Sequence, residues 1–205
     1  MPRSRLAALL ITALLGLQAC GGGGDEAAGS GSSSGGGGSG GSTPTTPTTP
    51  GSPTTPTGAD LTCGFANFQS EALRLINARR AAGASCGTRG SFAPAPALAW
   101  NAALANAAYG HSLDMATQNY FAHDSLDGRS LGTRVTAAGY NWSTVGENIA
   151  AGYATLPAVI DGWMTSDGHC ANLMSASFTE VGLACARNGA STYGIYWTQN
   201  LARPR

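Results

Sequence analysis

Apolar side chains recur at helical spacing in the first half of the sequence that can fold. They repeat every three or four residues from Phe65 to Arg79, and Gly83 follows as a stop signal. The same period returns from about Leu98 to Gln118. Both stretches predict amphipathic helices that bury one face against a core.

Two shorter segments carry the signals of helix ends. The stretch 130–138 is followed by Gly139, and glycine is the residue most typical of a helix C-terminus. The stretch 156–165 is preceded by Thr155 as N-cap and has Pro157 in its first turn, where the missing N–H does no harm. Two further helices are predicted.

The period changes to that of strands near the C-terminus. Apolar residues dominate from Phe178 to Cys185, and alternate residues from Thr192 to Leu201 share one face. The Asn188-Gly189 pair between them is a hairpin signal. Helices first and strands later predict an α+β fold built in layers.

The N-terminus predicts an export signal over residues 1–20. Arg3 and Arg5 precede a 12-residue apolar run, and Ala19 stands before Cys20. As a helix the run would span about 18 Å, too short to cross a bilayer. The stretch Leu17-Gln18-Ala19-Cys20 resembles the bacterial lipobox.

The lipobox resemblance implies that Cys20 is diacylated and anchors the chain to the cell envelope. In a Gram-negative cell, Gly21 beside it would fit sorting to the outer membrane. The alternative is an ordinary signal peptide and a secreted protein.

Composition separates a spacer from the domain. Of the 38 residues in 21–58, 34 are Gly, Ser, Thr or Pro, which cannot bury enough apolar surface to form a core. The first part is rich in Gly and Ser, and the second is rich in Thr and Pro. Residues 59–205 are left as a single domain, large enough for its own core.

Charge excludes a nucleic-acid partner. The chain has 11 basic residues, all of them Arg, and 11 acidic residues, so its formal net charge is zero. Proteins that bind nucleic acid carry a basic excess or a basic stripe, and this sequence has neither.

Four cysteines in an exported domain predict two disulfides. We expect Cys63–Cys86 and Cys170–Cys185, because each pair brackets one local unit of structure. Each bond would contribute about 3 kcal/mol by closing a short loop. A cysteine zinc site is disfavoured, since no two of the four have the C-x-x-C spacing.

Three histidines and one glutamate are the candidate functional residues. His111 lies on the apolar face of its helix and is expected to be a packed core residue. His123 and His169 lie in polar segments where helices end. Glu147 is flanked by Gly and apolar residues, and burying it requires hydrogen bonds or a cation. A metal site, an acid–base pair and a structural cluster all remain open.

Several other catalytic motifs are missing from the domain. Residues 59–205 contain no H-E-x-x-H pair, no G-x-G-x-x-G loop and no P-loop. With the four domain cysteines paired, no thiol is free to act as a nucleophile.

Several blocks of sequence together resemble the CAP superfamily, which includes cysteine-rich secretory proteins, insect venom antigens and plant pathogenesis-related proteins. The closest likeness is to its bacterial extracellular branch, and it extends over residues 65–201. The blocks are His111 to Ala116, Asn119 to His123, Ala138 to Tyr140, Gly146 to Ala150, Trp163 with Gly168-His169 and Asn172-Leu173, Phe178 to Gly182, and Tyr196 to Asn200.

This resemblance implies a three-layer α-β-α sandwich with a cleft that holds two histidines and two acidic residues. His123, Glu147 and His169 match three of these positions. Ser166 stands where many eukaryotic relatives have Glu, with Asp167 beside it, so either could be the fourth member. The set implies a divalent cation such as Zn²⁺ in the cleft, held more weakly than by four ligands.

Two functions from different classes follow from this resemblance. The first is a non-enzymatic module, tethered to the envelope, that binds a lipid, a wall component or a protein. Its groove would be lined by exposed aromatic residues such as Tyr120, Tyr140, Trp142 and Tyr153. The second is a metal-assisted hydrolase or protease with Glu147 as general base. A purely structural cluster is the third interpretation.

Overall fold

The computed structural model of the protein describes residues 60–205. The predicted signal peptide, the spacer 21–58 and Cys20 lie outside the described residues. No helix within 60–205 combines the length and the apolar character that a bilayer-spanning segment needs.

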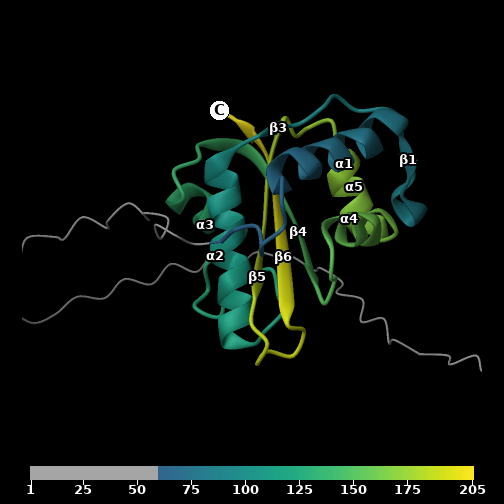
Figure 1. Cartoon of the computed structure of the whole chain (residues 1–205). Helices are drawn as coiled ribbons and strands as arrows, with labels where there is room; N and C mark the ends of the chain where they lie inside the picture. Colours follow the sequence, from purple (N-terminus) through teal and green to yellow (C-terminus); the bar gives the residue numbers. More distant parts are fainter. Residues whose placement is uncertain (1–59) are drawn as a thin grey trace, which may run out of the picture. The chain divides into compact units, whose positions relative to one another are not determined.

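A four-stranded sheet forms the middle layer of the domain (Figure 1). Its strands are β3 (Ala99–Trp100), β4 (Trp142–Ala151), β5 (Glu180–Arg187) and β6 (Ile195–Pro204). They lie in the order β3-β5-β6-β4, with β3 parallel to β5 and the other neighbours antiparallel. β4 is therefore an edge strand of this sheet.

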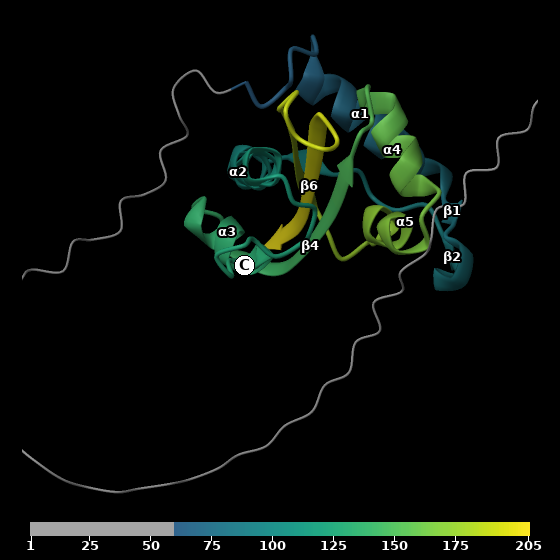
Figure 2. The same ribbon diagram turned by 90° about the horizontal axis from the view of Figure 1, so that it is seen from below.

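Helices cover both faces of the sheet (Figure 2). One face carries α2 (Ala102–Gln118) and α3 (Leu131–Ala137). The other carries α1 (Phe68–Ala82), α4 (Leu156–Met164) and α5 (Asp167–Met174). The predicted three-layer α-β-α sandwich is confirmed. A small hairpin of β1 (Ala84–Ser85) and β2 (Ser91–Phe92), with a 3-10 turn η1 (Gly87–Arg89) between its strands, precedes β3.

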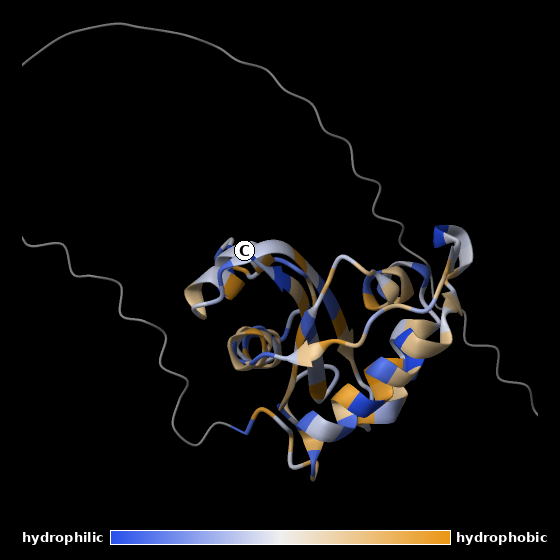
Figure 3. Cartoon of the chain, turned by 90° about the horizontal axis from the view of Figure 1, so that it is seen from above, coloured by the Kyte–Doolittle hydropathy of each residue, from blue (hydrophilic) through white to orange (hydrophobic). Residues whose placement is uncertain are grey.

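The core has one main cluster on the α1 side of the sheet and smaller ones on the α2 side. Along β6, Trp197 and Leu201 belong to the main cluster, while Tyr196 and Ala202 belong to clusters on the opposite side. Both faces of β6 are buried, and its apolar residues are interrupted by three buried polar residues, Thr198, Gln199 and Asn200. In Figure 3, α1 carries hydrophobic and hydrophilic residues side by side, as an amphipathic helix should.

Local signals explain where the helices begin. The side chain of Asn101 accepts hydrogen bonds from the N–H groups of Ala103 and Leu104, so α2 starts at Ala102 and not at Leu98 as expected. α2 then lies directly against β5, where a Cβ on Gly182 would come 2.1 Å from the backbone nitrogen of Ala105. Only glycine allows this approach.

The four predicted helices and the β5–β6 hairpin are present. The oxygen of Thr155 caps α4 as expected, by accepting from Ala158 N–H, and the oxygen of Ser130 caps α3. The short elements β1, η1, β2 and β3 were not predicted. Two longer elements were also missed, namely the ten-residue strand β4 and the eight-residue helix α5. Both carry candidate site residues.

The predicted disulfide pairing is wrong. The bonds are Cys63–Cys185 and Cys86–Cys170, with Cα–Cα distances of 5.9 and 5.5 Å. The 15-residue helix α1 separates Cys63 from Cys86 and spans about 22 Å, so a rigid rod holds these two residues apart. The chain before α1 instead runs beside β5, where Leu61 C=O accepts from the Cys185 N–H at 3.0 Å.

Candidate functional site

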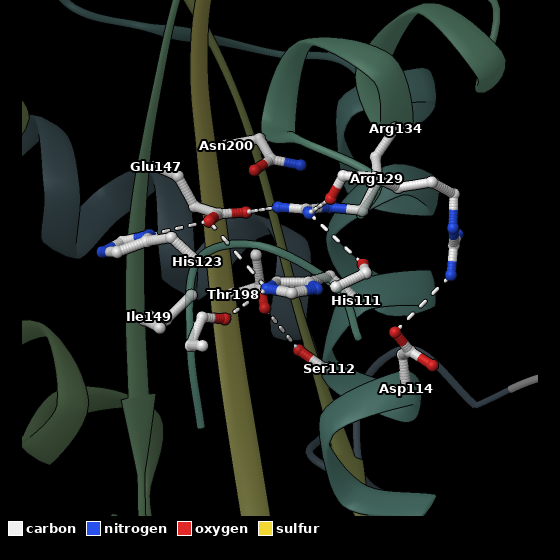
Figure 4. Close-up of polar contacts among 12 residues, drawn as sticks. His111, Ser112, Asp114, His123, Arg129, Arg134, Glu147, Ile149, Thr198 and Asn200 are labelled. Carbon is white, nitrogen blue, oxygen red and sulfur yellow. Dashed lines mark hydrogen bonds and ion pairs between the residues drawn. The ribbon is translucent and has the colours of Figure 1, made fainter. Parts of the chain in front are cut away.

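Glu147 is a buried carboxylate at the centre of the predicted site. It lies on β4, and its side chain is only 2% exposed. Its Oε1 accepts a hydrogen bond from His123 Nδ1 at 2.9 Å, and its Oε2 accepts one from Arg134 Nη2 at 2.8 Å (Figure 4). The sequence prediction that a buried Glu147 needs a cation or hydrogen bonds is thereby met.

Arg134 is the cation that sequence reasoning missed. Its guanidinium is 4% exposed and also donates to the carbonyl of Arg129 at 2.8 Å and to Ser125 Oγ at 3.4 Å. A buried guanidinium satisfied in this way is a strong partner for a carboxylate. The sequence did hold a signal for this residue, because a carboxylate among apolar neighbours, such as Glu147, needs a cation from elsewhere in the chain.

His111 is fully buried behind Glu147, as expected for a core residue. Its Nε2 lies 3.0 Å from the carbonyl oxygen of Ala122, and because a carbonyl only accepts, Nε2 must carry the proton. Its Nδ1 has no hydrogen-bond partner among the described residues. Burial lowers the pKa of His111 below its usual 6.5, so the ring is neutral at pH 7.

His123 and His169 approach the site from different elements. His123 follows α2, and its side chain is 58% exposed while it donates to Glu147. His169 lies on α5, with its Nδ1 2.9 Å from the hydroxyl oxygen of Ser166. Burial lowers the pKa of His169, and the charge of His123 lowers it further.

Ser166, and not Asp167, lies beside His169. The carboxylate of Asp167 points to the small hairpin, where it accepts from the N–H of Thr88 at 2.7 Å and from the Thr88 hydroxyl. A Cβ on Gly87 would overlap this carboxylate, at 2.2 Å from its Oδ1. These hydrogen bonds lower the pKa of Asp167. Asp167 as a fourth cleft member is therefore wrong.

An aromatic pocket of about 270 Å³ opens next to His169 and Ser166. Its rim includes three unusually exposed large side chains, Phe121 at 44%, Tyr153 at 37% and Tyr193 at 49%. The complete lining is Phe121, Ile149, Ala150, Ala151, Tyr153, Gly162, Trp163, Ser166, His169 and Tyr193.

Of the four aromatic residues expected at the groove, only Tyr153 lines this pocket. The hydroxyl of Tyr120 donates to Asp114 at 2.7 Å, and that of Tyr140 donates to Glu180. The ring of Trp142 packs on α3, where Gly132 leaves room for it.

The donor set fits a metal ion poorly. Within residues 60–205, no three His, Cys, Asp or Glu side chains lie close enough to hold a metal together. Both oxygens of Glu147 are taken by His123 and Arg134, which leaves only the free Nε2 atoms of His123 and His169. Catalytic zinc sites use three protein ligands and structural ones four. Zinc binding at this site therefore stays a prediction.

The same contacts limit Glu147 as a general base. A base must reach the proton that it removes, directly or through one water. The carboxylate is 2% exposed, and each oxygen already accepts a hydrogen bond from a cationic or polar partner. The pocket and not the carboxylate is the part of the site open to a ligand.

Comparison with known proteins gives the family. Residues 73–201, well over half of the chain, match the cysteine-rich secretory protein family, CAP. The chain belongs to the CAP family. The resemblance found in the sequence is confirmed, and the CAP domain accounts for the sandwich described above.

Curated relatives of this CAP protein come from Bacillus subtilis. The chain is 36% identical over 106 residues to the uncharacterised membrane protein YlbC, covering 52% of this chain and 29% of that protein. It is 35% identical over 96 residues to the uncharacterised protein YkwD, covering 47% and 35%. The chain thus spans about a third of the length of these relatives.

Two solved structures are similar to this chain. An extracellular protein with an SCP domain from Bacillus anthracis is 38% identical, with a TM-score of 0.47, over 53% of this chain and 34% of that one. An outer surface protein from Borrelia burgdorferi is 15% identical, with a TM-score of 0.52, over 67% and 96%. The second likeness supports the fold alone.

Proposed function

We propose that this CAP-domain protein is an exported, non-enzymatic binding module that takes its ligand in the aromatic pocket beside His169. The observation that carries the proposal is the pocket itself, a concave site with exposed aromatic walls and two polar groups, Ser166 and His169, in its lining. Small-ligand sites commonly combine an apolar wall with a few fixed polar groups. A lipid, a wall component and a protein segment are the candidate ligands.

Location outside the cytoplasm is part of the proposal. Two disulfides join distant parts of the domain, which is typical of an oxidising compartment. The similar structures are described as an extracellular protein and an outer surface protein. Anchoring to the envelope through a lipid on Cys20 rests on the lipobox resemblance of the sequence.

The binding proposal is tested by co-sedimentation of the full chain with two defined materials. These are purified peptidoglycan sacculi and vesicles of phosphatidylethanolamine and phosphatidylglycerol. All proteins carry Cys20→Ser, so that no lipid on Cys20 contributes to vesicle binding. The pocket variant is Phe121→Ala/Tyr193→Ala, and Leu126→Ala, which removes an apolar side chain 63% exposed outside the pocket lining, is the matched control.

We expect binding to at least one material in the wild type and the control, and its loss in the pocket variant. Binding that the pocket variant retains, or no binding at all, would overturn the proposal.

Zinc and the hydrolase alternative are tested together by isothermal titration of the same protein with Zn²⁺ at pH 7. We expect no micromolar binding, because only the Nε2 atoms of His123 and His169 are left as candidate ligands, fewer than the three or four protein ligands that zinc sites use. A micromolar isotherm that disappears in His123→Ala/His169→Ala would restore the metal site and make a screen for hydrolysis the next step.

A further inference from the structure

The pocket beside His169 also indicates the chemical class of its ligand. We propose that it binds the ring of a neutral sugar, with the apolar face of the pyranose on the aromatic rim. This inference rests on the proposed function, since it names the ligand of the same pocket.

The rim aromatics form a fixed platform. The rings of Phe121 and Tyr193 meet edge to face, with centroids 6.0 Å apart and an angle of 61°, and Tyr193 meets Tyr196 at 5.8 Å and 80°. Each exposed ring is therefore held by a neighbour. The face of an aromatic ring carries negative charge density, which attracts the weakly positive C–H groups on one face of a pyranose.

Tyr153 completes the rim from the loop after β4. Its ring lies over Gly162 of α4, where a Cβ would come 2.5 Å from the Tyr153 hydroxyl. Glycine at this position is what lets the tyrosine lie across the helix. Three rings from three separate segments thus border one opening.

The polar groups of the pocket suit hydroxyl groups on the ligand. The hydroxyls of Tyr153 and Tyr193 make no hydrogen bond within residues 60–205, and His169 uses only its Nδ1. Ser166 lies in the same lining. A sugar ring offers hydroxyls at its edge to such groups, whereas an acyl chain would leave them unpaired.

The absence of charged side chains from the pocket lining disfavours an anionic ligand. No Asp, Glu or Arg is among the residues that line the pocket. The guanidinium of Arg134, the cation of the neighbouring Glu147 cluster, is already paired with that carboxylate. Recognition of phosphate or carboxylate groups draws on such cations, so a phospholipid headgroup would find no partner here.

A peptide added as a strand is also disfavoured, although β4 is an edge strand beside the pocket. The outward carbonyl of Glu147 accepts from Asn172 Nδ2 at 3.2 Å, and that of Ile149 accepts from Trp163 Nε1 at 3.1 Å. Strand addition needs such edge groups to be free. The volume of about 270 Å³ suits one ring and is small for a long acyl chain.

The test is an NMR titration of the full chain carrying Cys20→Ser with two neutral probes, triacetylchitotriose and cellotriose. We expect saturable shifts with at least one probe. Tyr193→Ala should weaken its binding about two- to tenfold, because one ring contact is lost, and Leu126→Ala should leave it unchanged. Tighter binding of triacetylchitotriose than of cellotriose would indicate that the pocket recognises acetamido sugars, as in wall glycans. Equal affinity for the two probes would indicate that it recognises the pyranose ring alone.

The outcomes separate this inference from the proposed function. If neither sugar binds but the vesicles bind in a manner that Tyr193→Ala abolishes, the sugar inference is wrong and the binding pocket stands. If no probe shows binding that depends on Tyr193, both are wrong. Sugar binding that Tyr193→Ala leaves unchanged places the sugar outside the pocket and also overturns the inference.

Discussion

At the scale of single residues, the Glu147–Arg134 pair governs the stability of the site. Both side chains are almost completely buried, so the loss of one leaves an uncompensated charge in the protein interior. We expect Arg134→Ala to lower the free energy of unfolding by about 3–5 kcal/mol. Urea denaturation at pH 7 measures this loss.

Arg129→Ala is the matched control for that prediction. Arg129 is 45% exposed and pairs with Asp114 and Asp127 at the surface, where an ion pair contributes about 0–1 kcal/mol. Its backbone carbonyl, which accepts from Arg134, remains in the variant. Equal losses in the two variants would show that Glu147 does not depend on Arg134.

The lowered pKa values of His111 and His169 predict how the stability of the fold depends on pH. Burial lowers the pKa of each in the folded protein, so below pH 6.5 the unfolded chain takes up protons that the folded one does not. Stability is therefore complete above about pH 7 and falls as the pH is lowered through 6.5 and below.

Replacing His111 with Gln tests its share of this loss. Glutamine keeps an N–H donor for the carbonyl of Ala122 but does not titrate. We expect the free energy of unfolding, measured by urea denaturation, to fall less between pH 8 and pH 5 in His111→Gln than in the wild type. Identical pH profiles for the two proteins would contradict a lowered pKa at His111.

Residue types in sequence predicted part of the site and missed the rest for a geometric reason. His123 and Glu147 come together as expected. Ser166 meets His169 three residues later at the start of α5, which is a local contact, whereas Asp167 meets Thr88 only because of the orientation of α5 against the small hairpin. That orientation is set by tertiary packing, which no local pattern encodes.

At the scale of elements, the two longest that sequence patterns missed, β4 and α5, carry site residues. β4 includes Gly146-Glu147-Asn148, which interrupts the apolar alternation expected of a strand, and α5 includes Gly168 near its start. Asn148 donates to Gln199 on β6 and to the carbonyl of His169 on α5, so its amide joins both elements. Residues that serve a site often depart from the sequence patterns typical of strands and helices, so secondary-structure prediction from sequence fails at these two elements.

The disulfides link elements that are far apart in sequence, and this pairing can be tested with one substitution. Cys63→Ala should leave Cys185 as a free thiol and keep Cys86–Cys170 intact. Thiol alkylation without reduction, followed by peptide mass spectrometry, identifies the labelled residue. Labelling of Cys86 would instead support the local pairing. The variant should also lose about 2–5 kcal/mol of stability.

At the scale of the whole molecule, periodicity predicted the α+β class, but the order of layers and strands followed only from the resemblance to the CAP superfamily. Strand β4 pairs with β6, with Glu147 opposite Asn200, more than fifty residues away along the chain. Such pairings are set by the folded core and not by nearby residues. A family resemblance supplies them because it transfers a complete topology.

The whole chain, including the segment before the domain, sets where the pocket is presented. If the lipobox resemblance of residues 17–20 holds, the mature chain begins at a lipid-modified Cys20, and the spacer 21–58 separates the CAP domain from the membrane. In an exporting bacterium fed an alkyne-tagged palmitate, we expect the wild type to be labelled and to fractionate with membranes. Cys20→Ala should lose the label, because no other residue provides this attachment point.

Cys63→Ala is the control, since it removes a cysteine of the domain and leaves Cys20 in place. It should remain labelled and membrane-bound. An unlabelled wild-type protein recovered in the soluble fraction would support the ordinary signal peptide. The pocket would then reach its ligand by diffusion, and its affinity for an isolated sugar would have to sustain binding without the high local concentration that a membrane tether provides.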